Sequence, residues 1–443
     1  MTADKQAEYV LQTVAKRGIR FIRLWFTDVQ GFLKSVAISP AELETALTEG
    51  MTFDGSSIDG YARVHEADMI AKPDPTTFQI LPWREPDGVA RIFCDIHHTD
   101  GTPFAGDPRN VLRRNLREAN ELGYSFYVAP ELEFFYFADS GPEPKVLDHG
   151  GYFDLTPLDT AQEYRRTTIE HLEKLGIPVE QSHHEVAPSQ HEITLRYDDA
   201  MAMADNVMSY RLTVKEVALA HGIYATFMPK PLEDHDGSGF HTHMSLFEGD
   251  QNAFYSADAE NGLTPTAEAF IAGLVHHAPA MTAITNQWVN SYKRLVAGFE
   301  APIYAFWARN NQSALVRVPT IKAGKASSTR VEYRSPDAAT NPYLTFSVLL
   351  AAGLDGIRNG RTLPDELGKN VFEMSASERT QLGIRRLPET LSHALDELEQ
   401  SELMNQALGD HVFDWFLRNK RKEWDAYQHH VSRFELERYL PIL

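Results

Sequence analysis

Cysteine is almost absent from this sequence of 443 residues, in which Cys94 is the only one. A single cysteine excludes an internal disulfide framework and is typical of proteins that stay in a reducing cytoplasm. Long hydrophobic runs are absent as well, since nothing approaches the roughly 18 consecutive apolar residues of a membrane-spanning helix. The opening MTADKQAEYVLQTVAKRG has no apolar signal core and has the pattern of an amphipathic helix. We therefore expect a soluble cytoplasmic protein without a membrane span.

Basic residues are few relative to acidic ones. The chain has 42 Lys and Arg against 62 Asp and Glu, which gives a formal net charge of -20. This balance argues against nucleic acid or an anionic membrane as the main partner, because both attract positively charged surfaces. It does not exclude a small anion held by a local group of arginines. The hydrophobic share of 43% is that of an ordinary globular protein, so the chain can bury a large core.

The first hundred residues have the pattern of a small mixed domain. Apolar spacing predicts a helix over 4–17, and two alternating runs over 19–28 and 31–39 predict a β-hairpin. A short helix over 40–50 follows, with Pro at its start and Gly at its end. Next come a loop-rich stretch over 53–83 and a strand over 90–96. The turn-rich DGTPFAGDPR then suggests a domain boundary at residue 103, which divides the chain into 1–103 and 104–443.

The rest of the chain mixes helical and strand patterns without repeats or long linkers. The fold class we expect is therefore α+β, with a small N-terminal domain before a large one. Helices are predicted at 108–122, 158–175, 198–221, 264–281, 338–357, 389–404 and 408–428, and strands at 124–137, 178–184, 190–196, 223–228 and 239–247.

Two glutamates interrupt an otherwise apolar strand pattern in YVAPELEFFYF, residues 127–137. Residues two apart point to the same face of a strand, so Glu131 and Glu133 are expected side by side. Two buried carboxylates repel one another and are costly unless a positive charge accompanies them. The pattern therefore predicts a positively charged group or a metal cation beside Glu131 and Glu133.

Three further segments carry carboxylate, imidazole or guanidinium groups among large apolar neighbours. Each one alone is also compatible with a solvated strand face, but the four segments together favour a common site. The groups are Glu180, His183, His184, Glu185 and Glu192 in VEQSHHEVAPSQHEITLRY, His241, His243 and Ser245 in GSGFHTHMSLF, and Arg330, Glu332 and Arg334 in STRVEYRSPD.

Carboxylates with imidazoles and no thiolate suit hard or borderline divalent cations such as Mg²⁺ or Mn²⁺. Such ions would relieve the repulsion between paired glutamates. Arginines beside a glutamate-rich metal site indicate phosphoryl transfer, in which metals and guanidinium groups neutralise the transferred group. Neither a Walker loop nor GxGxxG occurs, so a nucleotide must be held in another way. The residues by themselves indicate a metal-dependent enzyme that handles ATP and a small anion, without naming the reaction.

Two loops are ambiguous on spacing alone. Asp54 and Ser57 lie in MTFDGSSIDGYARVHEADM, where a turn or helix-cap role is the simpler interpretation. Arg294, Glu300 and Arg317 lie among glycines and prolines in NSYKRLVAGFEAPIYAFWARNNQSALVRVP, which fits a mobile loop or an ordinary surface loop.

Several long motifs occur together and in order from about residue 20 to the C-terminus: FDGSSIDGYARVHEADM, PELEFF, HHEVAPSQHEI, FMPKP, GSGFHTHMSL, NSYKRLVAGFEAP and RVEYRSPDAATNPY. In this set the chain resembles bacterial type I glutamine synthetases. The resemblance implies an N-terminal β-grasp domain and a catalytic α+β domain. It also implies a homo-oligomer of twelve subunits in two hexameric rings, with active sites between neighbours.

The resemblance implies metal-binding and nucleotide-binding roles for ten residues. One metal, on the amino-acid and ammonium side, would be held by Glu133, Glu185 and Glu192. The second, on the ATP phosphates, would be held by Glu131, His241 and Glu332. Contacts to the nucleotide are implied for Glu180, Tyr197, His243 and Ser245, with Tyr197 against the adenine.

Roles toward the other substrates follow from the same resemblance. Arg294, Arg334 and Gly237 would hold glutamate. Asp54 of a neighbouring subunit, with Ser57 and Tyr152, would form the ammonium pocket, where Asp54 takes a proton from ammonium. Glu300 would shield the intermediate, and Arg317 and Arg330 would lie near the transferred phosphate.

The implied reaction is glutamine biosynthesis, a ligase step of nitrogen metabolism. ATP phosphorylates the γ-carboxylate of glutamate, and ammonia then attacks the γ-glutamyl phosphate. Both metals and the arginines suit the charge that develops in the first step, and an acidic group beside the amine suits the second.

Three positions depart from the family pattern. Gln312 stands where an arginine is expected at the phosphates, and Asp236 stands where an asparagine helps to hold glutamate. Phe372 occupies the position of the tyrosine that one branch adenylylates, which places this chain in the shorter, non-adenylylated branch. The first two departures leave an alternative open, a γ-glutamyl-amine ligase that uses a polyamine or monoamine. A third hypothesis, which rests on Gln312 alone, is an assembly protein that binds nucleotide or a regulator without turnover.

Overall fold

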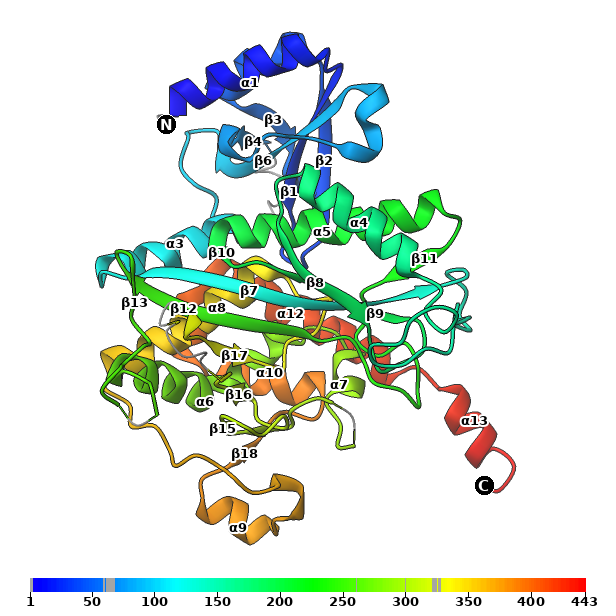
Figure 1. The fold of residues 1–443 in the computed structure, drawn as a ribbon, viewed down its shortest axis with the longest axis vertical. Coiled ribbons are helices and arrows are strands. Elements are labelled where there is room, and N and C mark those ends of the chain that lie inside the picture. Colours follow the sequence, from blue (N-terminus) through cyan, green and yellow to red (C-terminus); the bar gives the residue numbers. More distant parts are fainter. Residues whose placement is uncertain are drawn as a thin grey trace.

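The computed structural model describes residues 3–58, 60, 68–259, 261–298, 300–320, 325 and 328–443. Two β-sheets of unequal size organise the chain, and helices pack between and around them (Figure 1). The smaller sheet is built from the N-terminal residues, and the larger one lies at the centre of the remainder. This mixture of sheets and helices confirms the predicted α+β class.

The smaller sheet has six strands in the order β2-β1-β6-β4-β3, with β5 paired to β6. Its β1 and β2 form the predicted antiparallel hairpin, and β1 also runs parallel to β6. The elements are α1 (Ala3–Arg17), β1 (Phe21–Thr27), β2 (Leu33–Ile38), α2 (Leu43–Glu49), β3 (Met51–Asp54), β4 (Asp68–Pro73), β5 (Gln79–Ile80) and β6 (Val89–His98).

Strand β1 faces two different cores, as its alternation of side chains requires. Ile22, Leu24 and Phe26 pack into the core of the small sheet. Trp25 points the other way and packs into the core of the larger part, edge-on against Phe93 at a ring-centroid distance of 5.6 Å. The small sheet is therefore joined to the rest of the chain through its second face.

The prediction of a loop-rich stretch over 53–83 is wrong in part. The described residues of this stretch contain β4 and β5, and β3 ends at Asp54. β4 pairs with β6, placing Met69 opposite His98 and Pro73 opposite Cys94. Short strands of mixed composition are stabilised by their long-range partners rather than by their own propensity, and so local sequence gives little sign of them.

The larger sheet has ten strands, with a main path β15-β16-β17-β12-β7-β9-β8. β10 and β11 also pair with β7, and β13 pairs with β12. The strands are β7 (Ser125–Phe137), β8 (Val179–His184), β9 (Gln190–Leu195), β10 (Asp198–Asp199), β11 (Tyr224–Thr226), β12 (Phe240–Glu248), β13 (Gln251–Asn252), β15 (Trp307–Ala308), β16 (Val316–Arg317) and β17 (Val331–Tyr333); β14 (Tyr304–Ala305) and β18 (Arg385–Arg386) form a separate pair.

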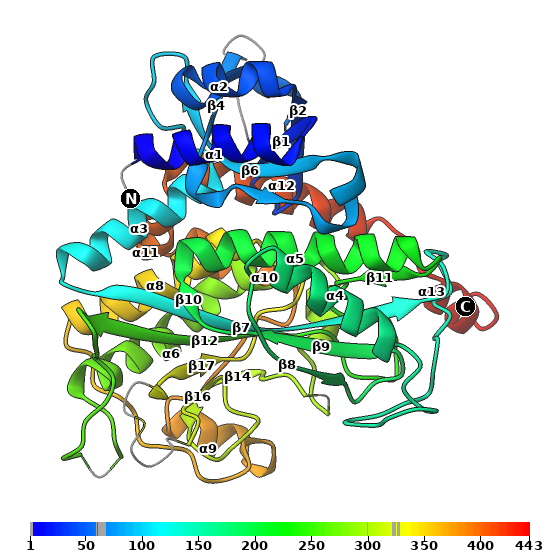
Figure 2. The same ribbon diagram turned by 45° about the horizontal axis from the view of Figure 1, so that its top comes forward.

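Helices pack against this sheet, and α5 lies between it and the N-terminal domain (Figures 1 and 2). Tyr210 of α5 donates a hydrogen bond to the Leu132 carbonyl of β7 at 3.1 Å, which fixes the helix to the central strand. The helices are α3 (Pro108–Glu121), α4 (Gln162–Lys174), α5 (Ala200–Ala220), α6 (Pro265–Thr285), α7 (Ser291–Arg294), α8 (Pro342–Arg358), α9 (Ala376–Gln381), α10 (Leu391–Glu399), α11 (Glu402–Leu408), α12 (Asp410–Gln428) and α13 (Arg433–Tyr439).

Capping residues explain where helix boundaries differ from the prediction. Asn341 caps α8, so this helix begins at Pro342 rather than near 338. The helix predicted over 389–404 is two helices, because the Ser401 side chain accepts from the Met404 N–H and starts α11 separately. The α9 and α13 helices were not predicted; α13 has no buried residue and hence no core-facing stripe.

A buried arginine joins the two parts of the chain. Arg109 of α3 is 4% exposed and donates to Asp205 of α5, to Asp74 and to Asp95, at distances from 2.6 to 3.1 Å. Asp74 and Asp95 belong to the N-terminal domain, so these charges fix its orientation. Among the described residues, none of the helices has the length and apolarity needed to cross a membrane.

Candidate active site

The register of three neighbouring strands gathers the predicted acidic residues. On β7, Glu131 stands opposite His241 of β12, and Glu133 stands opposite Glu192 of β9. Glu131 and Glu133 share a face of β7, as the period of two predicts. The two glutamates of this apolar strand therefore lie beside polar side chains that the adjacent strands supply.

One cluster forms around Glu131. His243 Nε2 lies 2.8 Å from Glu131 Oε1, and His241 Nδ1 lies 3.2 Å from Oε2. Arg330 Nε donates to His243 Nδ1 at 3.2 Å, so the His243 proton is on Nε2 and is donated to Glu131. Glu332 completes the cluster, 3.8 Å from His241. His243, assigned to the nucleotide by the resemblance, is therefore located beside the predicted metal ligands.

A second cluster forms around Glu185, at the end of β8. His183 Nε2 lies 2.6 Å from Glu185 Oε1, and ligand atoms of His183, Glu185 and Glu192 all lie within 4.8 Å of one another. Glu133 lies beside this cluster and accepts hydrogen bonds from the Gly239 N–H at 2.8 Å and from Gln190 Nε2 at 3.0 Å.

Burial and mutual repulsion shift the proton affinities of these carboxyls in opposite directions. Burial raises the pKa of Glu192 well above its usual value, and the carboxylates of Glu131, Glu133 and Glu185 raise it further. Burial also raises the pKa of Glu133. In Glu131, burial acts in the same direction, but the two imidazoles outweigh it and hold the pKa well below its usual value. The carboxylates of the two clusters thus carry more negative charge than the neighbouring imidazole and guanidinium groups neutralise.

The donor set fits divalent cations. Because an ionised Glu131 can only accept, His241 donates from Nδ1, and in the neutral imidazole Nε2 then carries the lone pair. This buried Nε2 atom has no hydrogen-bond partner among the described residues. A lone pair of this kind, next to several carboxylates, is a typical metal ligand. A Cβ on Gly239 would lie 3.0 Å from His241 Nε2 and 3.1 Å from Glu133 Oε1, so glycine keeps the space between these two ligands open.

Arginines border the clusters on the β16–β17 side. Glu332 Oε2 accepts from Arg317 at 2.8 Å, and Glu332 Oε1 accepts from Arg334 at 2.5 Å. Arg294 is 2% exposed and donates to the Ser335 and Pro336 carbonyls at 2.7 and 3.3 Å. Its Nε has no partner among the described residues. Guanidinium groups held in this way are positioned for an anionic substrate next to the carboxylates.

The loops at the mouth of the site place Gly237, Asp236 and Glu300 together. The Gly237 carbonyl accepts from Gln190 Nε2 at 3.1 Å, and the same amide group reaches Glu133. The Glu300 N–H donates to Asp236 Oδ1 at 2.9 Å. Partial burial raises the pKa of Glu300, and the nearby carboxylates of Asp236 and Glu185 add to the effect.

Three of the residues predicted to contact nucleotide lie toward one end of the sheet, away from the Glu131 cluster. Tyr197 is 67% exposed and lies edge-on to Tyr127 at 6.0 Å. Ser245 of β12 stands opposite Tyr127. Glu180 is exposed on β8 at a register irregularity opposite the end of β9. An exposed aromatic ring at the same end of the sheet as a hydroxyl and a carboxylate group is suited to a base and its sugar.

The predicted ammonium pocket is only partly assembled within one chain. Tyr152 lies beside the Glu185 cluster, with its ring 5.3 Å from that of His183. Asp54 is at the end of β3 in the smaller sheet, exposed, where it accepts the Ser56 N–H at 2.8 Å. The side chain of Ser57 falls outside the described residues. Asp54 is therefore not brought to the clusters of its own chain.

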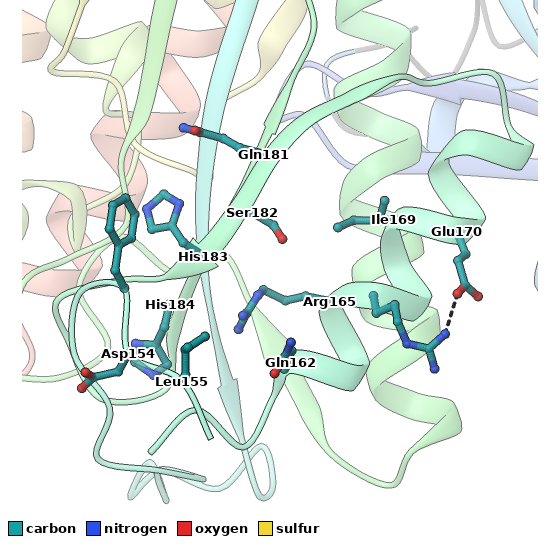
Figure 3. Close-up of a pocket in the computed structure, with 12 residues that line it drawn as sticks. Asp154, Leu155, Gln162, Arg165, Ile169, Glu170, Gln181, Ser182, His183 and His184 are labelled. Atoms are coloured by element: carbon teal, nitrogen blue, oxygen red, sulfur yellow. Dashed lines mark hydrogen bonds and ion pairs between the residues drawn. The ribbon is translucent and has the colours of Figure 1, made fainter. Parts of the chain in front are cut away.

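Sequence reasoning missed two sets of residues that support the site. Gln190, an uncharged side chain, links Glu133 to Gly237, and no local pattern marks it. Behind β8 and β9, His184, which the sequence did single out, packs 4.8 Å from His191 and is bonded to Asp148 at 3.0 Å, while His191 is bonded to Arg165 at 2.8 Å; Asp148, Arg165 and His191 were not predicted. A cavity of about 500 Å³ borders this region between β8 and α4 (Figure 3).

The chain is similar to known proteins over nearly its whole length. Residues 18–99 match the family described as glutamine synthetase, beta-grasp domain, and residues 105–439 match glutamine synthetase, catalytic domain. A glutamine synthetase from Mycolicibacterium smegmatis is 57% identical over 99% of this chain and 100% of its own length. One from Thermotoga maritima is 47% identical over 98% and 99%. A solved structure of a GmaS/ADP complex superposes with a TM-score of 0.89 at 31% identity, over 98% of this chain and 99% of that one.

Proposed function

We propose, since this chain belongs to the glutamine synthetase family, that it ligates ammonium to the γ-carboxylate of glutamate at the expense of ATP. The two adjacent carboxylate–imidazole clusters, bordered by Arg317, Arg330 and Arg334, are the observation that carries the proposal. They combine cation binding with guanidinium groups, which is what transfer of a phosphoryl group to a carboxylate needs. The names of the relatives favour ammonium ligation over the amine ligase that the departures left open.

Two divalent cations, Mg²⁺ or Mn²⁺, would each have their own ligands. Glu133, Glu185 and Glu192 would hold one cation. The other would be held by Glu131, His241 and Glu332. Bound there, the cations supply Lewis-acid stabilisation of the phosphate oxygens and neutralise the crowded carboxylates.

The side chains of this protein would divide the remaining work. Arg294 and Arg334 hold the glutamate carboxylate, with the Gly237 backbone at its amino group, and orient the γ-carboxylate toward the ATP γ-phosphate. Arg317 and Arg330 stabilise the charge on the transferred group. Glu180, Tyr197, His243 and Ser245 hold the nucleotide, and His243 also holds Glu131 in place.

The second step needs a neutral amine. Asp54 of a neighbouring subunit, with Ser57 and Tyr152, would take the proton of ammonium. Ammonia then forms a bond to the carbonyl carbon of the γ-glutamyl phosphate, the bond from that carbon to the phosphate oxygen breaks, and phosphate leaves. Glu300 keeps water away from the acyl phosphate. Asp54 lies on the smaller sheet and does not reach the clusters of its own chain. This position supports the proposed dodecamer of two rings, in which Asp54 would meet the clusters of a neighbouring subunit.

The organisation of the chain is part of the proposal. We retain a boundary at residue 103, since the two family matches end at 99 and resume at 105. We also propose a cytoplasmic protein, because a single cysteine fits a reducing compartment.

The test is an assay of ADP release by the purified protein with ATP, glutamate and Mg²⁺ or Mn²⁺. Ammonium, ethanolamine, putrescine and spermine are added in turn, and the products are identified by mass. Glutamine as the main product is expected. A γ-glutamyl amine with little glutamine, or ATP binding without any product, would overturn the proposal.

A further inference from the structure

A cavity of about 580 Å³ lies away from the carboxylate clusters, and the proposed reaction gives it no task. Its walls include the tip of the β1–β2 hairpin, one side of α5, the segment that precedes α7 and the C-terminal end of α12. The residues assigned above to metal, nucleotide and glutamate all lie outside these walls. A cavity of this volume is large enough for a small-molecule ligand.

Hydrogen bonds between distant segments hold the hairpin wall of the cavity. Gln287 Nε2 donates to the Gln30 carbonyl at 2.8 Å, and Asn341 Nδ2 donates to the Val29 carbonyl at 3.1 Å. Gly31 has a φ of +91°, and a Cβ there would lie 3.1 Å from Asn341 Cα, so glycine permits this close approach. The cavity is therefore formed before any ligand arrives.

Aromatic rings make up much of the apolar wall. Phe227 is buried, whereas Phe32 and Tyr427 are partly open to solvent. The rings of Phe32 and Trp288 lie 5.9 Å apart, and Trp288 Nε1 donates to the Ala339 carbonyl at 3.2 Å. Walls of this kind suit a ligand with a flat apolar body.

The charged part of the wall is mainly cationic. Arg211, Lys215 and Lys293 line the cavity, and within the described part of the chain none of their side chains forms a salt bridge. The carboxylate of the wall, Glu423, already accepts from Lys420 Nζ at 2.8 Å. The cavity thus has an excess of positive charge in a chain whose formal net charge is -20.

Arg211 is buried without a hydrogen-bonding partner for most of its guanidinium group. It is 9% exposed, and its Nε and Nη2 have no acceptor among the described residues. Asp337, the carboxylate that acts on Arg211 through space, instead accepts from Asn286 at 3.1 Å and from the Ala339 N–H at 3.0 Å. A buried donor without an acceptor costs free energy, and an anion bound beside it would remove that cost.

Burial and mutual repulsion act on the two basic groups of α5. Burial lowers the pKa of Arg211 to about 10, so the guanidinium stays charged at neutral pH. Burial also lowers the pKa of Lys215, and the charge of Arg211 lowers it further. An anion next to both groups would oppose these effects by favouring their charged forms.

We propose that this cavity binds a small oxyanion, a carboxylate or a phosphate, carried on an aromatic or similarly flat apolar body. Arg211 and Lys215 bind the charged group, and Phe227 and Trp288 contact the apolar body. A guanidinium group matches the oxygens of both carboxylate and phosphate, so the shared chemistry is that of the oxyanion. Binding at this site is separate from the proposed reaction and does not depend on it.

The test is isothermal titration calorimetry of the purified full-length protein with three naphthalene probes. 2-Naphthoate and 2-naphthyl phosphate carry the two oxyanions, and 2-naphthylmethanol is their neutral counterpart. At least one anion should bind with a dissociation constant on the order of 0.1 mM, the range for a ligand of this size. The alcohol should bind about tenfold more weakly or worse.

Two conditions keep the probes from reporting on the carboxylate clusters or the nucleotide region. A chelator in the buffer prevents the anions from binding through a metal ion. An excess of ADP should leave the affinity for the anions unchanged, because the cavity lies outside the residues assigned to the nucleotide.

Two variants and a control locate the site. Arg211→Met removes the charge but keeps much of the side-chain volume, and it should weaken anion binding by about tenfold. Lys215→Met should weaken it by about threefold, and because Lys215 is exposed, this variant leaves the core intact. Lys174→Met, at an exposed lysine of α4 outside the cavity, should bind like wild type.

Four results would each overturn the proposal: no binding of either anion, equal affinity for the alcohol and the anions, wild-type affinity in either α5 variant, or displacement by ADP. The titration needs no turnover. A protein that makes no glutamine would therefore reject the proposed function and leave this test unaffected.

Discussion

Replacing Glu192 by Gln should stabilise the metal-free protein and at the same time weaken its binding of metal. Glu192 is 4% exposed and accepts a hydrogen bond from Thr194 at 2.8 Å, which the amide oxygen of Gln can also accept. The substitution keeps the shape and the hydrogen bond but removes one negative charge from the crowded clusters. Opposite effects on stability and on metal affinity are the signature of a site assembled for cations.

The magnitude follows from the spacing of the charges. Ligand atoms of Glu185 and Glu192 lie within 4.8 Å, a distance at which two like charges repel by about 3.5 kcal/mol at an effective dielectric of about 20. The hydrogen bond between His183 Nε2 and Glu185 Oε1, 2.6 Å long, offsets part of this repulsion. We expect a net gain of about 1–3 kcal/mol in the free energy of unfolding of the metal-free variant.

The pH dependence gives a further check of the sign. The pKa of Glu192 is raised in the folded state, so ionised Glu192 costs stability above that pKa. The cost shrinks as pH falls below the raised pKa, where folding takes up a proton at Glu192, and it is gone below the ordinary carboxyl pKa, where Glu192 is neutral in both states. The advantage of Glu192→Gln should therefore be largest in alkaline buffer and shrink on acidification.

Thermal unfolding with a chelator, and then with Mn²⁺, measures both effects. Metal at about 100 times its dissociation constant stabilises a protein by about 2.7 kcal/mol, and most of this increment should be lost in Glu192→Gln. Glu248→Gln, an exposed carboxylate at the end of β12, is the control and should change neither value. A variant that is less stable than wild type in chelator, or that keeps the full response to Mn²⁺, would refute the reasoning.

Three other predictions concern the remaining charges of the chain. Arg109→Met should lower the free energy of unfolding by about 3 kcal/mol in urea titrations, since it leaves buried carboxylates unpaired, whereas Arg113→Met should cost far less because Arg113 is half-exposed. Burial raises the pKa of Asp74, but Arg109 and Thr76 outweigh it and bring that pKa below its usual value. The stability that ionised Asp74 contributes is therefore present above about pH 4 and lost on further acidification. In acid titrations, Arg109→Met should lose less stability over this range than the wild type. Gln312→Arg should raise ammonium-dependent turnover by adding a phosphate contact, and an unchanged kcat and KM for ATP would remove that role from position 312.

The long elements could be predicted because their signals are local. Helices α3, α5 and α12 and strands β7 and β12 have the apolar periodicity of their class over many residues, and each was predicted within a few residues of its bounds. β14, β15, β16 and β18 have two residues each, and exist only because distant segments pair with them. No window of sequence contains that information.

The candidate site divides in the same way. That Glu131 and Glu133 share one face follows from the period of a strand and could be read from YVAPELEFFYF. The pairing of His241 with Glu131, and of Glu192 with Glu133, depends on strand register, which is set by packing across the whole sheet. The resemblance to a family supplied the residue roles before this register was visible, but it gave no role to His183, which the structure places 2.6 Å from Glu185.

By itself, then, the sequence determined the chemistry that this protein can perform: carboxylates, imidazoles and arginines spaced along apolar strands, with no thiolate and no phosphate-binding loop. Tertiary structure decided which of these groups meet. It set His243 against Glu131, gave Gln190 its bridge from Glu133 to Gly237, and left Asp54 on the other sheet. The physical reason is that a side chain's type and face are local properties of the backbone, whereas its neighbours are chosen by long-range pairing and the burial of a common core.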